Sequence, residues 1–176
     1  KDVSFGMGLD QRIGERFLRA GPAYGGSCFP KDTRALIDTA NKFKTNLSIV
    51  QSVVRSNEQR KYFLARKVEK ILNGKLRNKV ITFLGVTFKP NTDDMREASS
   101  IPMINFLSKE GCKIRYYDPS GEKEDFKKIK NVQFCKNISS ACLKSDLVII
   151  HTEWNDFKIF NFKKLVKKKN ITVYDM

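Results

Sequence analysis

The run KVITFLGVTF, residues 79–88, decides the fold class of this chain of 176 residues. Its β-branched and aromatic side chains are typical of a strand buried on both faces. Similar runs follow at residues 113–117 (KIRYY) and 146–152 (DLVIIHT). Strands that alternate with helices indicate parallel β-α-β units with right-handed crossovers, so we expect a Rossmann-like, doubly wound parallel sheet over residues 75–176. Its remaining elements are predicted as helices over 99–111, 121–130, 137–145 and 155–168, and strands over 132–135 and 171–174.

Two helices are expected before this α/β domain. Apolar residues at helical spacing predict one helix over residues 31–45. A longer pattern begins at Ser48, a residue type that caps helices, and ends at Asn73-Gly74, a common stop signal. A helix of about 24 residues spans about 36 Å, which is long enough to join two domains. We therefore divide the chain into a helical segment, residues 1–74, and the α/β domain.

The formal charge of +15 at pH 7 is spread over the chain rather than confined to a tail. No basic motif interleaved with aromatic residues is visible, so we do not expect nucleic-acid binding. A basic surface still suits an anionic small molecule such as a nucleotide sugar. No apolar run approaches the roughly 18 residues that a membrane span needs, and no signal peptide opens the sequence, so we expect no membrane association.

One of the four cysteines differs from the others in its surroundings. None of them has metal-ligand spacing, so we expect no metal site. Cysteines in a chain without a secretion signal are expected to be reduced thiols, which places the protein in the cytoplasm. Cys112, Cys135 and Cys142 lie in apolar or helical contexts, where cysteine behaves as a small hydrophobe. Only Cys28 has the surroundings of a reactive thiol.

Cys28 belongs to the stretch FLRAGPAYGGSCFPKD, residues 17–32. Pro30 can open a helix directly after the cysteine, and the positive end of that helix, helped by Lys31, should favour thiolate over thiol. The pair Gly25-Gly26 lets the backbone approach a ligand closely. This pattern is typical of a nucleophile that is presented rather than buried.

The polar loop KPNTDDMRE, residues 89–97, follows the first strand, at the sheet edge where ligands of such folds bind. It replaces the G-x-G-x-x-G turn, which argues against ordinary dinucleotide binding in this domain. Lys89 and Arg96 can reach phosphates. The acidic residues of the loop can hold those cations or bind hydroxyls; they are Asp93, Asp94 and Glu97. The alternative is a salt-bridged surface loop without a ligand.

Three residues near the same edge have simpler explanations than ligand binding. Asp118 ends a strand, where a ribose-binding acid can lie, but Asp-Pro is also a standard turn, and we favour the turn. His151 closes an apolar strand with no serine or carboxylate placed to form a triad, so we expect a structural role. Trp154 can pack against a base or a neighbouring loop, and packing is the simpler expectation.

Five segments together carry a family resemblance. The strongest are GLDQRIG (residues 8–14), the 17–32 stretch around Cys28, and GVTFKPNTDDMRE (85–97); weaker ones are YDP (117–119) and TEW (152–154). In this order they resemble the UDP-glucose/GDP-mannose dehydrogenase family, almost from end to end of the chain. The resemblance implies the back part of the family's helical central (dimerisation) domain over 1–74 and its UDP-binding domain, truncated at the C-terminus, over 75–176.

The resemblance implies an oxidation chemistry. Enzymes of this family oxidise the C6 alcohol of a nucleotide sugar to a carboxylate with two NAD+ in succession, here UDP-glucose to UDP-glucuronate. Cys28 matches the nucleophile that captures the intermediate aldehyde as a thiohemiacetal, which is oxidised to a thioester and hydrolysed. Asp32, one helical turn after Cys28, matches the carboxylate that helps to activate water.

Binding residues follow from the same resemblance. The loop that holds the nucleotide sugar matches Phe17, Leu18, Arg19, Ala20, Gly21 and Gly25, with Tyr24 nearby. Lys89, which follows Phe88, matches a substrate-contacting lysine of the second domain. Lys31 and Arg96 match residues that touch NAD. Arg12 matches an arginine that reaches the substrate of a neighbouring subunit, which implies a homodimer through the long helix.

The chain also departs from the family pattern. The family's amino-terminal NAD-binding domain is absent, as is a stretch that supplies a catalytic lysine and asparagine, so we expect a fragment that cannot turn over alone. GDP-mannose or a UDP-acetylhexosamine is the alternative substrate, although Phe29 and the DQRIG segment favour UDP-glucose. A non-catalytic nucleotide-sugar-binding or assembly module is the alternative from another functional class.

Overall fold

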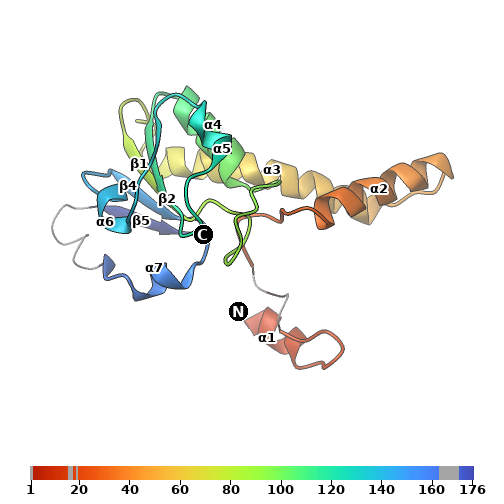
Figure 1. Ribbon diagram of the computed structural model, residues 1–176. Coiled ribbons are helices and arrows are strands. Elements are labelled where there is room, and N and C mark those ends of the chain that lie inside the picture. The colour runs from red at the N-terminus through yellow and green to blue at the C-terminus, as the bar shows by residue number, and fades with distance from the viewer. Residues whose placement is uncertain (1, 16–17, 19, 163–170) are drawn as a thin grey trace.

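A parallel sheet of five strands organises the second half of the chain (Figure 1). The structure is a computed structural model that describes residues 2–15, 18, 20–162 and 171–176. The strands lie in the order β3-β2-β1-β4-β5, and β1 pairs in parallel with both β2 and β4. They are β1 (Val80–Leu84), β2 (Lys113–Tyr117), β3 (Val132–Phe134), β4 (Leu147–Ile150) and β5 (Thr172–Asp175). The doubly wound parallel sheet expected from the sequence is confirmed.

Helices cover both faces of this sheet because its strands are apolar on both faces. Ile81 and Phe83 of β1 belong to a first core on one face of the sheet, and Leu84 belongs to a second core on the opposite face. Burying each such side chain completely contributes about 1.5–3 kcal/mol. The helices of this half are α4 (Ser100–Lys109), α5 (Glu124–Lys127), α6 (Ile138–Ala141) and α7 (Asn155–Ile159).

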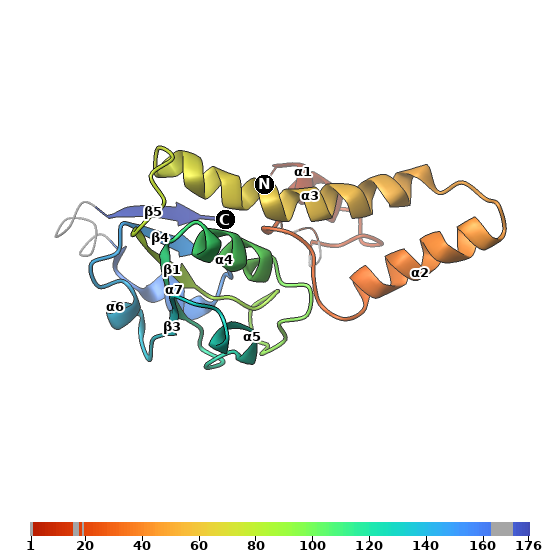
Figure 2. The same ribbon diagram turned by 90° about the horizontal axis from the view of Figure 1, so that it is seen from above.

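The first half of the chain forms a helical arm. It contains α1 (Asp2–Gly8), α2 (Phe29–Lys42) and the 24-residue α3 (Ser48–Ile71). Figure 2 shows α2 and α3 side by side and antiparallel, with the turn between them far from the sheet. The C-terminal half of α3 returns to the sheet, where Leu64, Ala65 and Val68 enter the first core beside α4. The same helix therefore belongs to the arm and to the sheet layers. The division at residues 74 and 75 stays a prediction.

Some elements are shorter than the sequence pattern predicts. The run at residues 79–88 is extended only as far as Leu84, because Gly85 takes φ +73° and a Cβ there would lie 2.6 Å from the Cβ of Thr152. The helix expected over 121–130 is reduced to the single turn of α5. The helix expected over 155–168 begins as α7 and ends at Ile159, while residues 163–168 lie outside the described part.

The helices do not have the character of membrane spans. Within the described residues, none is both long enough and apolar enough to cross a bilayer.

Candidate functional site

Cys28 lies immediately before the first residue of α2, and its side chain is exposed. The backbone amide of Asp32 donates a hydrogen bond of 2.8 Å to the Cys28 carbonyl and closes the first helical turn. Pro30 occupies that turn, where no amide donor is needed. The Oγ of Ser27 lies 3.5 Å from the Sγ of Cys28. The thiol is therefore open to solvent at the N-terminal end of a helix, as the sequence predicts.

The other three cysteines are buried thiols, as expected. Burial raises the pKa of Cys112 to about 11 and that of Cys142 to about 12, and it raises the pKa of Cys135 as well. A thiol must lose its proton before it becomes a good nucleophile. These three cysteines are therefore poor candidates for chemistry, which leaves Cys28.

The cysteine-bearing segment packs directly against the loop that follows β1, and we call this contact between residues 25–34 and 86–97 the seam. The Gly26 amide donates to the Arg96 carbonyl at 2.8 Å. A Cβ at Gly25 would lie 2.7 Å from the Glu97 carbonyl oxygen, and one at Gly26 would lie 2.8 Å from the ring of Phe88. The two glycines thus permit a close approach as expected, but the approaching atoms belong to this loop of the protein.

Both interpretations of the 89–97 loop find support in its contacts. The Arg96 guanidinium pairs with the Asp94 carboxylate at 2.9 and 3.0 Å, and this hydrogen-bonded pairing lowers the pKa of Asp94. Arg96 nevertheless leaves 68% of its side chain exposed. Lys89 is also exposed, with its Nζ 5.2 Å from the centre of the Phe88 ring. The loop is salt-bridged, and two cations beside the seam still face solvent.

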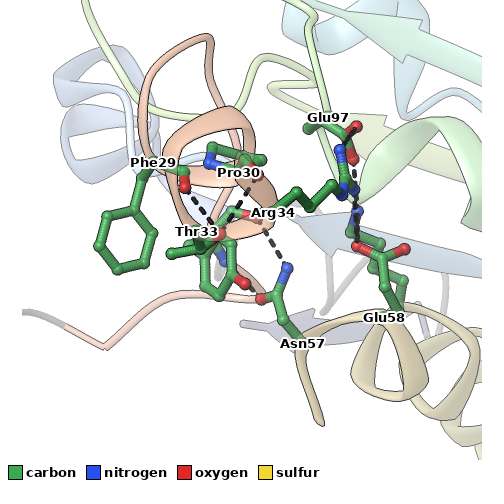
Figure 3. Close-up of polar contacts among 9 residues, drawn as sticks. Phe29, Pro30, Thr33, Arg34, Asn57, Glu58 and Glu97 are labelled. Carbon is green, nitrogen blue, oxygen red and sulfur yellow. Dashed lines mark hydrogen bonds and ion pairs between the residues drawn. The ribbon is translucent and has the colours of Figure 1, made fainter. Parts of the chain in front are cut away.

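The backbone before Cys28 is held by polar side chains of α3 that no sequence motif indicated, and Figure 3 shows one of them, Asn57. The buried side chain of Asn57 accepts from the Tyr24 amide at 2.9 Å and donates to the Tyr24 carbonyl at 3.1 Å. Arg60 donates to the carbonyl of Pro22 and, at 3.5 Å, to that of Gly21. The available signal is a polar stripe at helical spacing that continues to Lys61, at positions where a packed helix would bury apolar residues.

The predicted substrate loop is only partly described. Phe17 and Arg19 lie outside the described residues; Leu18 is half-buried and Ala20 and Gly21 are exposed. The Tyr24 ring contacts the Phe29 ring edge-on, with centroids 4.8 Å apart. An open groove of about 590 Å³ lies along the N-terminal half of α3 and takes in Tyr24, but Cys28 is not among its lining residues. The groove is therefore separate from the thiol.

Three predicted site residues on the arm have exposed side chains that form ion pairs with neighbours in sequence. Arg12 pairs with Asp10 at 2.6 Å, in the turn after α1. Figure 1 shows this turn apart from the start of α2, so the structure does not bring Arg12 to Cys28 within one copy of the chain. Lys31 and Asp32 pair at 3.4 Å, one turn beyond the thiol.

The remaining candidates at the sheet edge are buried. Asp118 is a turn residue, as favoured: its buried carboxylate accepts from the amides of Val86 at 2.8 Å and Ser120 at 3.0 Å, so both oxygens are already hydrogen-bonded within the protein. Trp154 packs in the second core, as expected, although its buried Nε1 has no hydrogen-bond partner among the described residues.

A serine lies beside His151, but the partner of the other ring nitrogen is a threonine and not the carboxylate of a triad. The Oγ of Ser99 is 2.8 Å from Nε2 of His151, and Nδ1 is 3.0 Å from the Thr152 hydroxyl. Ser99 comes from the loop before α4, 52 positions away, so no local pattern could reveal the contact. Burial lowers the pKa of His151 to about 4, and all three side chains are buried. The buried contact between Ser99 and His151 therefore fits a structural role for the histidine.

Comparison with known proteins matches two parts of the chain to two domains of one family. Residues 1–59 match the UDP-glucose/GDP-mannose dehydrogenase family, central domain, and residues 82–176 match the same family's UDP binding domain. This chain belongs to the UDP-glucose/GDP-mannose dehydrogenase family. Cys28 falls in the match to the central domain and the 89–97 loop in the match to the UDP binding domain. The seam thus joins the two family domains.

Named relatives within the family agree with this assignment. A UDP-glucose 6-dehydrogenase of Rhizobium meliloti (strain 1021) is 43% identical over 165 residues, which cover 94% of this chain and 38% of the relative. UDP-glucose 6-dehydrogenase YwqF of Bacillus subtilis (strain 168) is 43% identical over 90% of this chain and 36% of its own length. A UDP-glucose dehydrogenase structure from the hyperthermophilic archaeon Pyrobaculum islandicum superposes with a TM-score of 0.85 at 30% identity, over 99% of this chain and 39% of that one. The chain therefore spans less than two fifths of the length of these relatives.

Proposed function

We propose that this chain supplies the cysteine nucleophile and the nucleotide-sugar surface of an NAD-dependent UDP-glucose 6-dehydrogenase, which converts UDP-glucose to UDP-glucuronate. One observation carries the proposal: Cys28, the exposed cysteine, lies at a helix N-terminus where the two family domains meet. Relatives that are 43% identical over nine tenths of the chain bear this enzyme's name. Because the chain spans only part of those relatives, the reaction belongs to a longer protein.

The proposed chemistry centres on the sulfur of Cys28. NAD+, when bound, accepts a hydride in each of two oxidations, the first of which turns the C6 alcohol into an aldehyde. The Cys28 thiol adds to the aldehyde carbon, and its proton ends on the former carbonyl oxygen to give a thiohemiacetal. Loss of the C6 hydride, for which the second NAD+ would be the acceptor, and of the hydroxyl proton to solvent leaves a thioester on Cys28. Water, oriented by Asp32 one turn along, releases the carboxylate and restores the thiol.

We propose that the binding surface surrounds the thiol. The residues at 17–21, with Tyr24 and Gly25, hold the nucleotide sugar from the arm. Phe88 and Lys89 approach it from the other side of the seam, and the exposed ammonium of Lys89 suits the anionic diphosphate. Arg12, on the outlying turn after α1, reaches the substrate of a neighbouring subunit.

The contacts with NAD are proposed for Lys31 and Arg96. Both cations are exposed beside Cys28, which suits a pyrophosphate. The sheet edge itself does not fit a dinucleotide, because a polar loop replaces the glycine-rich turn and the Asp118 carboxylate is already hydrogen-bonded to the protein. We therefore assign this chain a peripheral share of the cofactor site.

We further propose a homodimer through α3 and a cytoplasmic location. Large apolar side chains are exposed along α3, among them Ile49, Val53, Tyr62 and Phe63, and covering them needs another protein surface. All four cysteines are free thiols, which suits a reducing compartment.

The decisive test is turnover by the full-length protein. We expect two NADH for each UDP-glucuronate formed from UDP-glucose. The reaction with GDP-mannose or UDP-N-acetylglucosamine should be much slower. Faster turnover of either of these would contradict the assignment of UDP-glucose as the substrate. The 176-residue chain alone should bind UDP-glucose in calorimetry without forming NADH. NADH formation by this chain alone would contradict the assignment of most of the NAD site elsewhere. Binding without turnover by the full-length protein would favour a non-catalytic module.

A further inference from the structure

Four charged side chains form a closed set of ion pairs across the seam (Figure 3). Arg34 of α2 donates to the Glu97 carboxylate at 2.8 Å and lies 3.5 Å from Glu58 of α3. Lys61 of α3 donates to the second Glu97 oxygen at 3.0 Å and to Glu58 at 2.9 Å. Each cation thus contacts both acids. Glu97 is the member that comes from the loop after β1, so it alone links that loop to both helices of the arm.

Burial makes this arrangement specific. Lys61 leaves only 5% of its side chain exposed, and a buried ammonium is stable only beside negative charge. Burial by itself would lower the pKa of Lys61, but the hydrogen bonds to Glu58 and Glu97 outweigh it, so that the pKa is raised. The hydrogen bond from Arg34, together with the one from Lys61, lowers the pKa of Glu97 to about 2. Arg34, Lys61 and Glu97 therefore stay charged near neutral pH.

The backbone at Glu97 is held as firmly as its side chain. Glu97 adopts φ +57°, which is uncommon for a residue other than glycine, and its carbonyl faces Gly25 where a Cβ would come within 2.7 Å. The preceding carbonyl, that of Arg96, accepts the Gly26 amide. The main chain two residues before Cys28 is thus joined to Arg96, and the helix that starts after Cys28 is joined through Arg34 to the next loop residue, Glu97.

We propose that Glu97 is a positioning residue for Cys28: its carboxylate ties α2 and α3 to the loop that carries Lys89 and Arg96. The thiol is thereby placed at a set distance from those two cations. The consequence for catalysis rests on the proposed function, whereas the mechanical link across the seam does not. Glu97 itself touches neither substrate nor thiol in this assignment.

The link is tested in this chain by amide hydrogen exchange. Glu97→Gln removes the charge and keeps the shape, and the Gly26 amide should then exchange about tenfold faster because charge-assisted bonds across the seam are lost. The matched control is Glu124→Gln, which removes the acid from an exposed ion pair with Lys127 on α5 and should leave Gly26 unchanged. Unaltered protection of Gly26 in Glu97→Gln would overturn the proposal.

A second variant guards against simple unfolding. Arg34→Gln breaks only the link to α2, since Lys61 keeps both acids, and Arg34 is nearly half exposed. It should accelerate Gly26 exchange severalfold while the thermal midpoint stays close to that of the parent chain. If Glu97→Gln unfolds, Arg34→Gln decides the matter. Equal protection in Arg34→Gln and the parent would then overturn the link.

The catalytic consequence is tested in the full-length protein. Glu97→Gln should lower kcat about tenfold and leave the KM for UDP-glucose within about twofold, because the thiol is displaced while the substrate contacts remain. An unchanged kcat together with faster Gly26 exchange would overturn the positioning role. If the full-length parent does not oxidise UDP-glucose, the proposed function fails, and the exchange experiment still decides whether Glu97 links the seam.

Discussion

The sheet layers and the helical arm bury their apolar residues to very different degrees. Ile81, Phe83 and Leu107 of the sheet layers have no exposed surface, and both faces of the sheet are covered by helices of the same chain. On the arm, Phe43 and Ile49 are 78% and 79% exposed, and α1 has no buried residue. The sheet layers thus form a closed core together with the C-terminal half of α3, whereas the rest of the arm leaves large apolar side chains exposed. The buried apolar residues are concentrated in one region, and the exposed thiol of Cys28 lies in the other.

The two regions also use cysteine in opposite ways. Buried Cys112 donates from its Sγ to the Leu76 carbonyl at 3.2 Å in the sheet layers, while Cys28 is exposed where the arm meets the loop after β1. The same residue type serves packing in one place and, in our proposal, chemistry in the other. The difference lies in the surroundings, because burial raises the pKa of Cys112 to about 11, whereas Cys28 is exposed directly before α2.

Replacing each of the two cysteines by alanine should therefore give the largest difference between the two regions. In the full-length enzyme, Cys28→Ala should reduce NADH formation from UDP-glucose by at least about 10³-fold, as removing a nucleophile does, with an unchanged thermal midpoint. Cys112→Ala should keep the activity and lower the midpoint by a few degrees, since it leaves a small cavity. Initial rates and thermal denaturation measure both. Substantial activity in Cys28→Ala would remove the thiol from the mechanism.

Adjacent residues of α3 sharpen the contrast in burial. Leu64 is 3% exposed in the first core and Phe63 is 60% exposed. Leu64→Ala should destabilise the chain by about 2–5 kcal/mol because it opens a cavity, and Phe63→Ala by less than about 0.5 kcal/mol, as for other surface sites. Urea unfolding at equal protein concentration gives both values. Similar losses for the two variants would mean that the arm has a core of its own.

The sheet layers should also show a pH dependence that the arm lacks. The pKa of His151 is about 4 in the folded chain, below the ordinary value of 6.5, because the ring is buried. The unfolded chain therefore binds a proton that the folded chain does not as the pH falls from 6.5 to 4, so stability should fall over this window. The slope contributed by one proton is at most about 1.4 kcal/mol per pH unit.

This slope is easy to assign, since His151 is the single histidine of the chain. His151→Gln should flatten the dependence between about pH 5.5 and 6.5, measured as urea-unfolding free energy in one buffer series. A slope that survives the substitution would show that another group is responsible.

The smallest expected effect concerns the two hydrogen bonds by which Asn57 holds the backbone of Tyr24. Asn57→Ala removes two hydrogen bonds to the backbone of Tyr24 and should cost about 1 kcal/mol, with faster amide exchange at Tyr24. Asn105→Ala removes a bond within α4, to the carbonyl of Ile101, and serves as the control, with no change at Tyr24. Unchanged exchange at Tyr24 in Asn57→Ala would show that other contacts hold the loop to α3.

Much of the fold could be predicted because the relevant signals are local. The strand at residues 113–117 was predicted with the bounds of β2, and the pattern from Ser48 predicted α3. The exposure of Cys28 followed from neighbours within four residues. The end of β1 at Leu84 was missed, because the turn at Gly85 depends on Thr152, a contact that only the folded sheet creates.

The sequence by itself determined the parallel α/β architecture, the long helix and the identity of the exposed thiol. These features follow from apolar residues that repeat every two residues in strands or every 3.6 residues in helices, and from the residues next to a side chain in the sequence. Tertiary structure alone decided that Asn57 clamps Tyr24, that Ser99 meets His151 and that Glu97 pairs with Arg34. Those partners stand 33, 52 and 63 positions apart, so their pairing depends on how whole elements pack rather than on any local pattern.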